Sequence, residues 1–111
     1  MQVAAKSDPH ARLLRAVLAL AGQGSEVTSS SSRRWSSATF TGARHGMTLQ
    51  LAGTDARERA HQLAETLPDA EFPLAGHIVA DISVESQAYR RGEDGEGVAQ
   101  LDLAVLTVED W

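Results

Sequence analysis

Two clusters of arginine and aromatic residues hold the side chains in this sequence that are best suited to bind a ligand. A guanidinium group binds phosphate or carboxylate through its planar fork, and an aromatic ring stacks on a base or on another ring. The six candidate ligand-binding residues are Arg34, Trp35, Arg44, His45, Tyr89 and Arg90. They suit a small-ligand or phosphate-binding enzyme or sensor, or a nucleic-acid site. Arginines at strand ends are more commonly solvated residues that discourage unwanted strand pairing.

A second set of polar residues could act on protons or metals. His77, Asp81 and Glu85 recur on one side of a predicted strand, and Asp102 could face them from a neighbouring strand. Positions two or four apart in a strand lie about 7 to 13 Å from each other, too far for one ion. The four histidines show no paired metal-binding spacing, and there is no cysteine. We therefore predict no metal site, no catalytic residues and no cofactor.

The composition bounds the class of protein. A chain of 111 residues fits a single domain, 1–111, and the absence of cysteine excludes disulfides and thiol chemistry. No apolar run reaches the length of a membrane span, so the expected location is the cytoplasm. The net charge of −5 makes nucleic acid an improbable partner, because affinity for a polyanion comes from clustered Lys and Arg.

Two amphipathic helices are predicted. Asp8 and Pro9 are typical of a helix start, an apolar stripe runs from Leu13 to Ala21, and Gly22 provides a stop. The second helix begins after Asp55, which resembles a capping box with Glu58, and ends at Pro68.

Four strands are predicted around them, in two hairpins. The first hairpin joins 34–41 to 47–51 through the GARHG segment, and a serine-rich mobile loop at 23–32 precedes it. The second hairpin begins with the strand from His77, whose alternation places Ile78, Ala80, Ile82 and Val84 on the core face. A glycine-rich turn at 92–97 leads to the last strand, around residues 101–105.

Residues 74–81, LAGHIVAD, resemble the signature of the LAGLIDADG homing endonucleases. In that family the motif is a helix and its terminal acidic residue binds the catalytic metal, a role that would fall on Asp81. Val79 stands where the motif has its first Asp, and Ile82 stands where it has Gly. The alternation here predicts a strand instead of a helix.

The element order α-β-β-α-β-β predicts an α+β fold, with both helices on one face of a four-stranded antiparallel sheet. Val79, Ala104 and Leu106 are apolar residues at positions that alternation assigns to the other, solvent-exposed face. Apolar side chains there are natural at an interface. The function we predict is therefore a non-catalytic interaction module, a homodimer or a subunit of a larger assembly, with protein partners and these three residues as interface candidates. A small molecule is the alternative partner.

Overall fold

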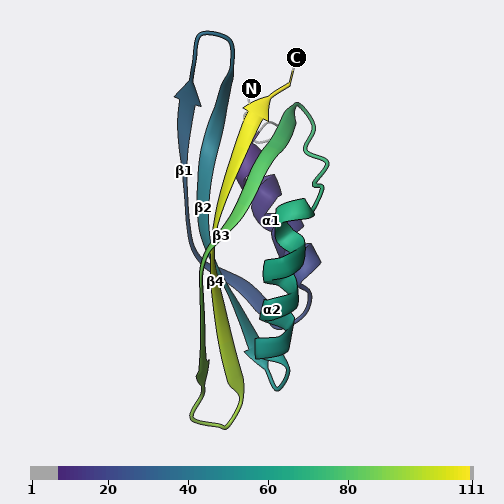
Figure 1. The fold of residues 1–111 in the computed structure, drawn as a ribbon, viewed down its shortest axis with the longest axis vertical. Coiled ribbons are helices and arrows are strands. Elements are labelled where there is room, and N and C mark those ends of the chain that lie inside the picture. The colour runs from purple at the N-terminus through teal and green to yellow at the C-terminus, as the bar shows by residue number, and fades with distance from the viewer. Residues whose placement is uncertain (1–7, 111) are drawn as a thin grey trace, which may run out of the picture.

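The computed structural model describes residues 8–110 and shows two layers, a four-stranded antiparallel sheet and two helices packed on one of its faces (Figure 1). The order α-β-β-α-β-β confirms the predicted fold class. Across the sheet the strands lie in the order β1-β2-β4-β3, so β1 and β3 form the edges. The elements in chain order are α1 (Pro9–Ala21), β1 (Ser25–Ser36), β2 (Thr41–Gly53), α2 (Ala56–Thr66), the single 3-10 turn η2 (Leu67–Asp69), β3 (His77–Arg91) and β4 (Gly97–Glu109).

Helix α1 begins and ends where its capping residues predict. The Asp8 carboxylate accepts hydrogen bonds from the backbone N–H groups of His10 and Ala11, and Gly22 closes the helix with φ at 86°. The buried stripe on this helix includes Leu13 and Val17. The helix is therefore anchored at its start by a charged cap and along its length by apolar packing.

Strand β1 corrects one prediction, because the serine-rich segment predicted as a loop at 23–32 is mostly strand. Eleven residues of β1 pair with β2, with one bulge between Val27 and Ser29. Serine is enriched in turns, but strand preference depends strongly on context, and here the long partner β2 supplies the hydrogen bonds that the segment could not make alone.

The first hairpin turns earlier than predicted, at Ser37–Phe40, and not at GARHG, residues 42–46. Ser37 closes this turn, because its N–H donates to the Phe40 carbonyl at 2.7 Å and its Oγ accepts from the Phe40 N–H. The glycines of GARHG lie in the extended strand β2. Gly42 is there for packing, since a Cβ on it would collide with the Thr107 carbonyl oxygen.

Strand β3 contains two bulges, at Ala80 and at Glu85, where its register with β4 shifts. Each bulge moves the following residues to the opposite face. As a result Ile82 is buried in the core, whereas Ile78 is 51% exposed on the other face. The prediction that Ile78 and Ile82 share a face was therefore wrong. The LAGHIVAD segment forms an isolated bridge at Leu74, a turn and the start of this strand, and not a helix.

One apolar cluster fills the space between the layers, built mainly from Leu, Ala and Val of both helices and the central strands. Leu49 and Leu101 are fully buried at its centre. Arg59 of α2 ties the helices together, because its Nη2 donates to the carbonyl oxygens of Ala21 and Gln23 at 2.6 and 2.7 Å. Asp55 caps α2 without a side-chain hydrogen bond, so the expected capping box does not form.

Candidate interaction surface

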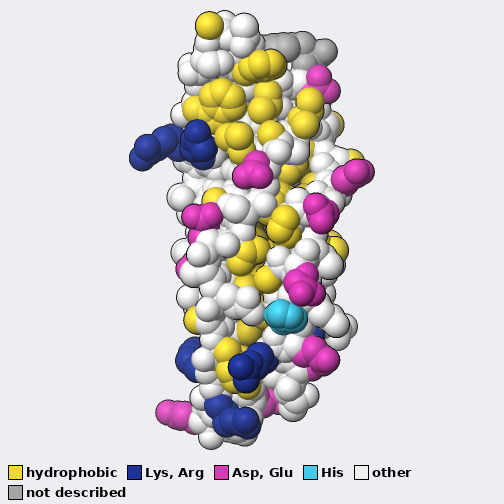
Figure 2. Space-filling view, viewed as in Figure 1, with side chains coloured by type: hydrophobic (Ala, Val, Ile, Leu, Met, Phe, Trp, Pro, Cys, Tyr) yellow, Lys and Arg dark blue, Asp and Glu magenta, His cyan; other side chains and the backbone are white. Residues whose placement is uncertain are grey.

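The sheet face opposite the helices, here called the open face, bears an apolar row at one end. Directly paired residues of neighbouring strands point to the same face, and the pairing places Trp35, Gly42, Val108 and Ile78 in one line from edge to edge. The Trp35 ring lies against Gly42, with Nε1 within 3.1 Å of where a Cβ would be. Phe40, in the adjoining turn, is 54% exposed. Figure 2 shows hydrophobic side chains gathered at this upper end of the molecule.

The next row of the open face is charged. It consists of Arg33, Arg44, Leu106 and Asp81, again in direct register from β1 to β3. Arg33 and Arg44 are exposed and directly opposite each other, an arrangement of like charges that is unfavourable. Among residues 8–110, no ion pair involves either of these arginines or Asp81. A hollow of about 330 Å³, lined in part by Ser31 and Gly46, lies between the two arginines.

Small and polar side chains occupy the middle of the open face. Ser31, Gly46, Ala104 and Ser83 form the third row, which leaves the backbone open to close approach. In the fourth row Asp102 accepts hydrogen bonds from Thr48 Oγ1 at 2.7 Å and from Ser86 Oγ. These two hydrogen bonds, the one from Ser86 first, lower the pKa of the Asp102 carboxyl, so it stays ionised.

The sheet separates the residues of the first predicted ligand cluster. Trp35 and Arg44 lie on the open face, whereas His45 is buried under the helices at 2% exposure. Arg34 is on the helix side as well, paired in register with Ala43, and it forms a 3.7 Å ion pair with Glu109. Neighbouring residues of one strand alternate between faces, so the four residues form no single site.

The second cluster lies at the far end of the sheet. Tyr89 pairs with Ala99, whereas the apolar row crosses β4 at Val108, so the two positions are about 30 Å apart along the strand. The Tyr89 ring instead receives the Arg57 guanidinium at 5.4 Å. Arg90 is exposed on the open face opposite Val98. The two clusters predicted from the sequence therefore do not adjoin.

Of the three interface candidates, two lie on the open face. Ala104 and Leu106 are half-buried there, between the fully buried residues of β4 that face the helices. Val79 pairs with Thr107 and packs against the core, because the bulge at Ala80 reverses the alternation. The placement of Val79 on the open face was therefore wrong. The alternation also concealed Ile78, which occupies that face instead, next to Val108 of β4.

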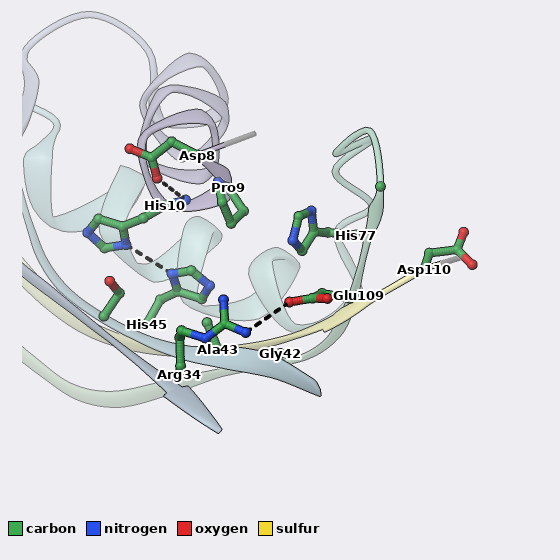
Figure 3. Close-up of a pocket in the computed structure, with 12 residues that line it drawn as sticks. Asp8, Pro9, His10, Arg34, Gly42, Ala43, His45, His77, Glu109 and Asp110 are labelled. Atoms are coloured by element: carbon green, nitrogen blue, oxygen red, sulfur yellow. Dashed lines mark hydrogen bonds and ion pairs between the residues drawn. The ribbon is translucent and has the colours of Figure 1, made fainter. Parts of the chain in front are cut away.

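A cavity of about 430 Å³ lies on the helix side of the same sheet end, between the first residues of α1 and β2 and the end of β4 (Figure 3). Its lining includes Arg34, His45, His77 and Glu109. Charges of both signs line it, and the Arg34 and Glu109 side chains are paired across it. Within residues 8–110, no three side chains are grouped as ligands for a metal ion.

A directed chain of hydrogen bonds runs beside this cavity. Thr107 Oγ1 donates to the Ala43 carbonyl, so its oxygen accepts from Nε2 of His45 at 3.0 Å. His45 Nδ1 is then the acceptor for Nδ1–H of His10, 2.9 Å away, and His10 Nε2 forms a further hydrogen bond with Ser30 Oγ at 3.2 Å. The planes of the two imidazole rings are 7° apart and their centroids are separated by 5.2 Å, as an in-plane hydrogen bond between them requires. This arrangement needs His45 neutral, because its Nδ1 is the acceptor, and it fastens α1 to β2.

Acidification is therefore expected to weaken the fold. Burial, followed by repulsion from His10 and His77 and opposed by Asp8, lowers the His45 pKa from 6.5 to about 4. As the pH falls below 6.5, His45 binds a proton in the unfolded chain but stays neutral in the folded protein. The unfolded state is therefore favoured progressively, and stability present at neutral pH is lost toward pH 4. Between pH 7 and 5 this residue should cost about 2 kcal/mol. Urea unfolding at the two pH values measures the loss, and His45→Gln should flatten the slope. An equal slope in that variant would refute the assignment to His45.

No protein-family model matches the chain, and no curated protein matches it. Solved structures share its fold. A chain from a structure described as "Virion of native gene transfer agent (GTA) particle" superposes with a TM-score of 0.62 at 17% sequence identity, covering 95% of this chain and 94% of that chain. At this identity the likeness shows the fold alone. Neither helix in residues 8–110 has the length and apolar character to cross a membrane.

Proposed function

We propose that this protein is a non-catalytic subunit of a multi-subunit protein particle and that it associates with further copies of itself through the upper end of the open face. The observation that motivates this most is the apolar row, which holds Trp35, Val108 and Ile78 and adjoins the turn residue Phe40; Ile78 in it is 51% exposed. Apolar side chains gathered on one face are costly to leave in water and are typical of interaction sites.

The fold likeness supports the same reading. The superposed chain belongs to a virion of a gene transfer agent, a particle, and almost the whole of both chains is matched. A sheet covered on one face only suits such a subunit, because the other face remains available to a neighbour. Of the two sequence-predicted interface residues on that face, Leu106 lies in the row next to the apolar row and Ala104 lies one row further along.

Sedimentation equilibrium tests the proposal. We expect the average mass to rise above that of the 11.8 kDa monomer as the protein concentration is increased from micromolar to millimolar. A protein that remains monomeric across that range would contradict association with copies of itself.

A second candidate function is small-molecule binding in the helix-side cavity, which the paired Arg34 and Glu109 and the imidazoles there favour. An anionic metabolite would displace Glu109 from Arg34. Arg34→Ala should then abolish binding in a metabolite screen, whereas Arg90→Ala, at the far end of the sheet, should leave it unchanged. Equal binding by the wild type and Arg34→Ala would argue against this site.

A further inference from the structure

The open face is self-complementary when one copy is turned over onto another. The sheet order β1-β2-β4-β3 has β2 and β4 at its centre. Consider two copies whose open faces face each other, related by a two-fold axis that is parallel to the strands. The axis lies halfway between the two sheets, at the line midway between β2 and β4. It places β1 over the partner's β3 and β2 over the partner's β4. Each transverse row then faces the same row in reverse order. Such an isologous contact needs a surface whose two halves match.

The charged row satisfies this condition. Reversal places Arg33, at one end of the row, opposite Asp81 at its other end, and Arg44 opposite Leu106. All three charged side chains are exposed and unpaired within the described residues of one copy. In the monomer the two arginines repel each other. The contact brings the partner's Asp81 carboxylate to them, and the two-fold symmetry forms this interaction twice.

The two halves of the apolar row also match each other under this reversal. Trp35 is placed opposite Ile78, and Gly42 opposite Val108. The largest side chain of the row thus meets the most exposed aliphatic one. Because the Trp35 ring lies against Gly42, the partner's Val108 meets that ring as well. The small residues of the third row, Gly46 and Ala104 among them, allow the two sheets to approach.

The contact is confined to the upper rows. The sheet is strongly twisted along its length, so that its upper and lower halves are turned relative to each other (Figure 1). Facing twisted sheets stay in register only near one crossing point. Asp102, in the fourth row, therefore stays hydrated with its two hydroxyl partners, and Arg90 lies outside the contact.

We propose that two copies pair open face to open face about this axis, with Arg33 of each copy bound to the Asp81 carboxylate of the other. This inference rests on the proposed function and specifies its geometry. The partner is a second copy, because the row that holds the unpaired arginines also holds Asp81. Its carboxylate lies too far across the sheet in one copy but faces Arg33 of the other copy.

A charge exchange tests the pairing. Arg33→Asp and Asp81→Arg should each weaken dimerisation in sedimentation equilibrium by at least tenfold, since each sets like charges against each other twice. The double variant should return the dissociation constant to within about threefold of the wild type. Arg90→Asp, on the same face but outside the contact, should have no effect. Thermal melts of all variants check that the monomer fold is retained.

The outcomes separate this inference from the proposed function. A wild type that dimerises, with single variants that the double variant does not rescue, would overturn the axis and leave self-association standing. A wild type that stays monomeric would overturn both. Rescue by the double variant supports the face, the axis and the Arg33 to Asp81 pairing together.

Discussion

Gly42→Ala is expected to lower the free energy of unfolding by about 3 kcal/mol or more, although it adds a single methyl group. The added Cβ would collide with the Thr107 carbonyl oxygen, a backbone atom that cannot move without disturbing the pairing of β2 with β4, and it would also press on the Trp35 ring. Core positions that cannot relax lose this much stability on overpacking. Chemical denaturation measures the change.

Gly46→Ala is the matched control, four residues along the same strand and face. Its Cβ would lie 3.2 Å from Ser31 Oγ, a side-chain atom that can rotate away. The expected change is under about 1 kcal/mol, because alanine also costs less backbone entropy than glycine. Equal effects of the two substitutions would show that Gly42 does not have the special packing role assigned to it.

Ile78→Asp is expected to weaken self-association about a hundredfold or more. The substitution sets a carboxylate opposite Trp35 of the partner, in an apolar row that would hold no partner for it, and the symmetry repeats the cost. Because Ile78 is 51% exposed in the monomer, the unfolding free energy at low concentration should change little. Sedimentation equilibrium gives the dissociation constant.

Leu20→Asp serves as its control. Leu20 is exposed to a similar degree, 46%, but lies on α1 in the helix layer. The same chemical change there should leave association unaltered. If both substitutions weaken association equally, the effect would come from general surface hydrophobicity and not from the open face.

The parts of the fold that the sequence predicted correctly have local causes. Asp8, Pro9 and Gly22 determine the limits of α1 through their own backbone and capping chemistry, so no tertiary information is needed. The last strand was recognised because Leu101, Leu103 and Val105 alternate without interruption and are all buried.

The errors have tertiary causes. The serines of β1 form a strand because they pair with β2. Gly42 was predicted to lie in a turn because it is a glycine, whereas in the structure it permits close packing against Trp35 and Thr107. The Ala80 bulge reverses the faces of Ile78 and Val79, and a bulge leaves no mark in an alternating pattern.

The pairing of buried His45 with His10 was missed for a related reason. His10 and His45 are 35 residues apart and meet only when α1 packs on the sheet. One local signal was present, since His45 shares its alternation with the buried Met47, Leu49 and Leu51. That signal predicts burial of the ring and not its partner.

The central claim is that the upper end of the open face is where copies of this protein meet. The most direct measurement is a dilution series of isotopically labelled protein followed by amide, methyl and indole NMR shifts. We predict that concentration-dependent shifts are confined to the upper rows, with the Trp35 indole, Ile78, Leu106 and Val108 foremost. Shifts located on the helices around Leu20, or none up to millimolar concentration, would contradict the claim.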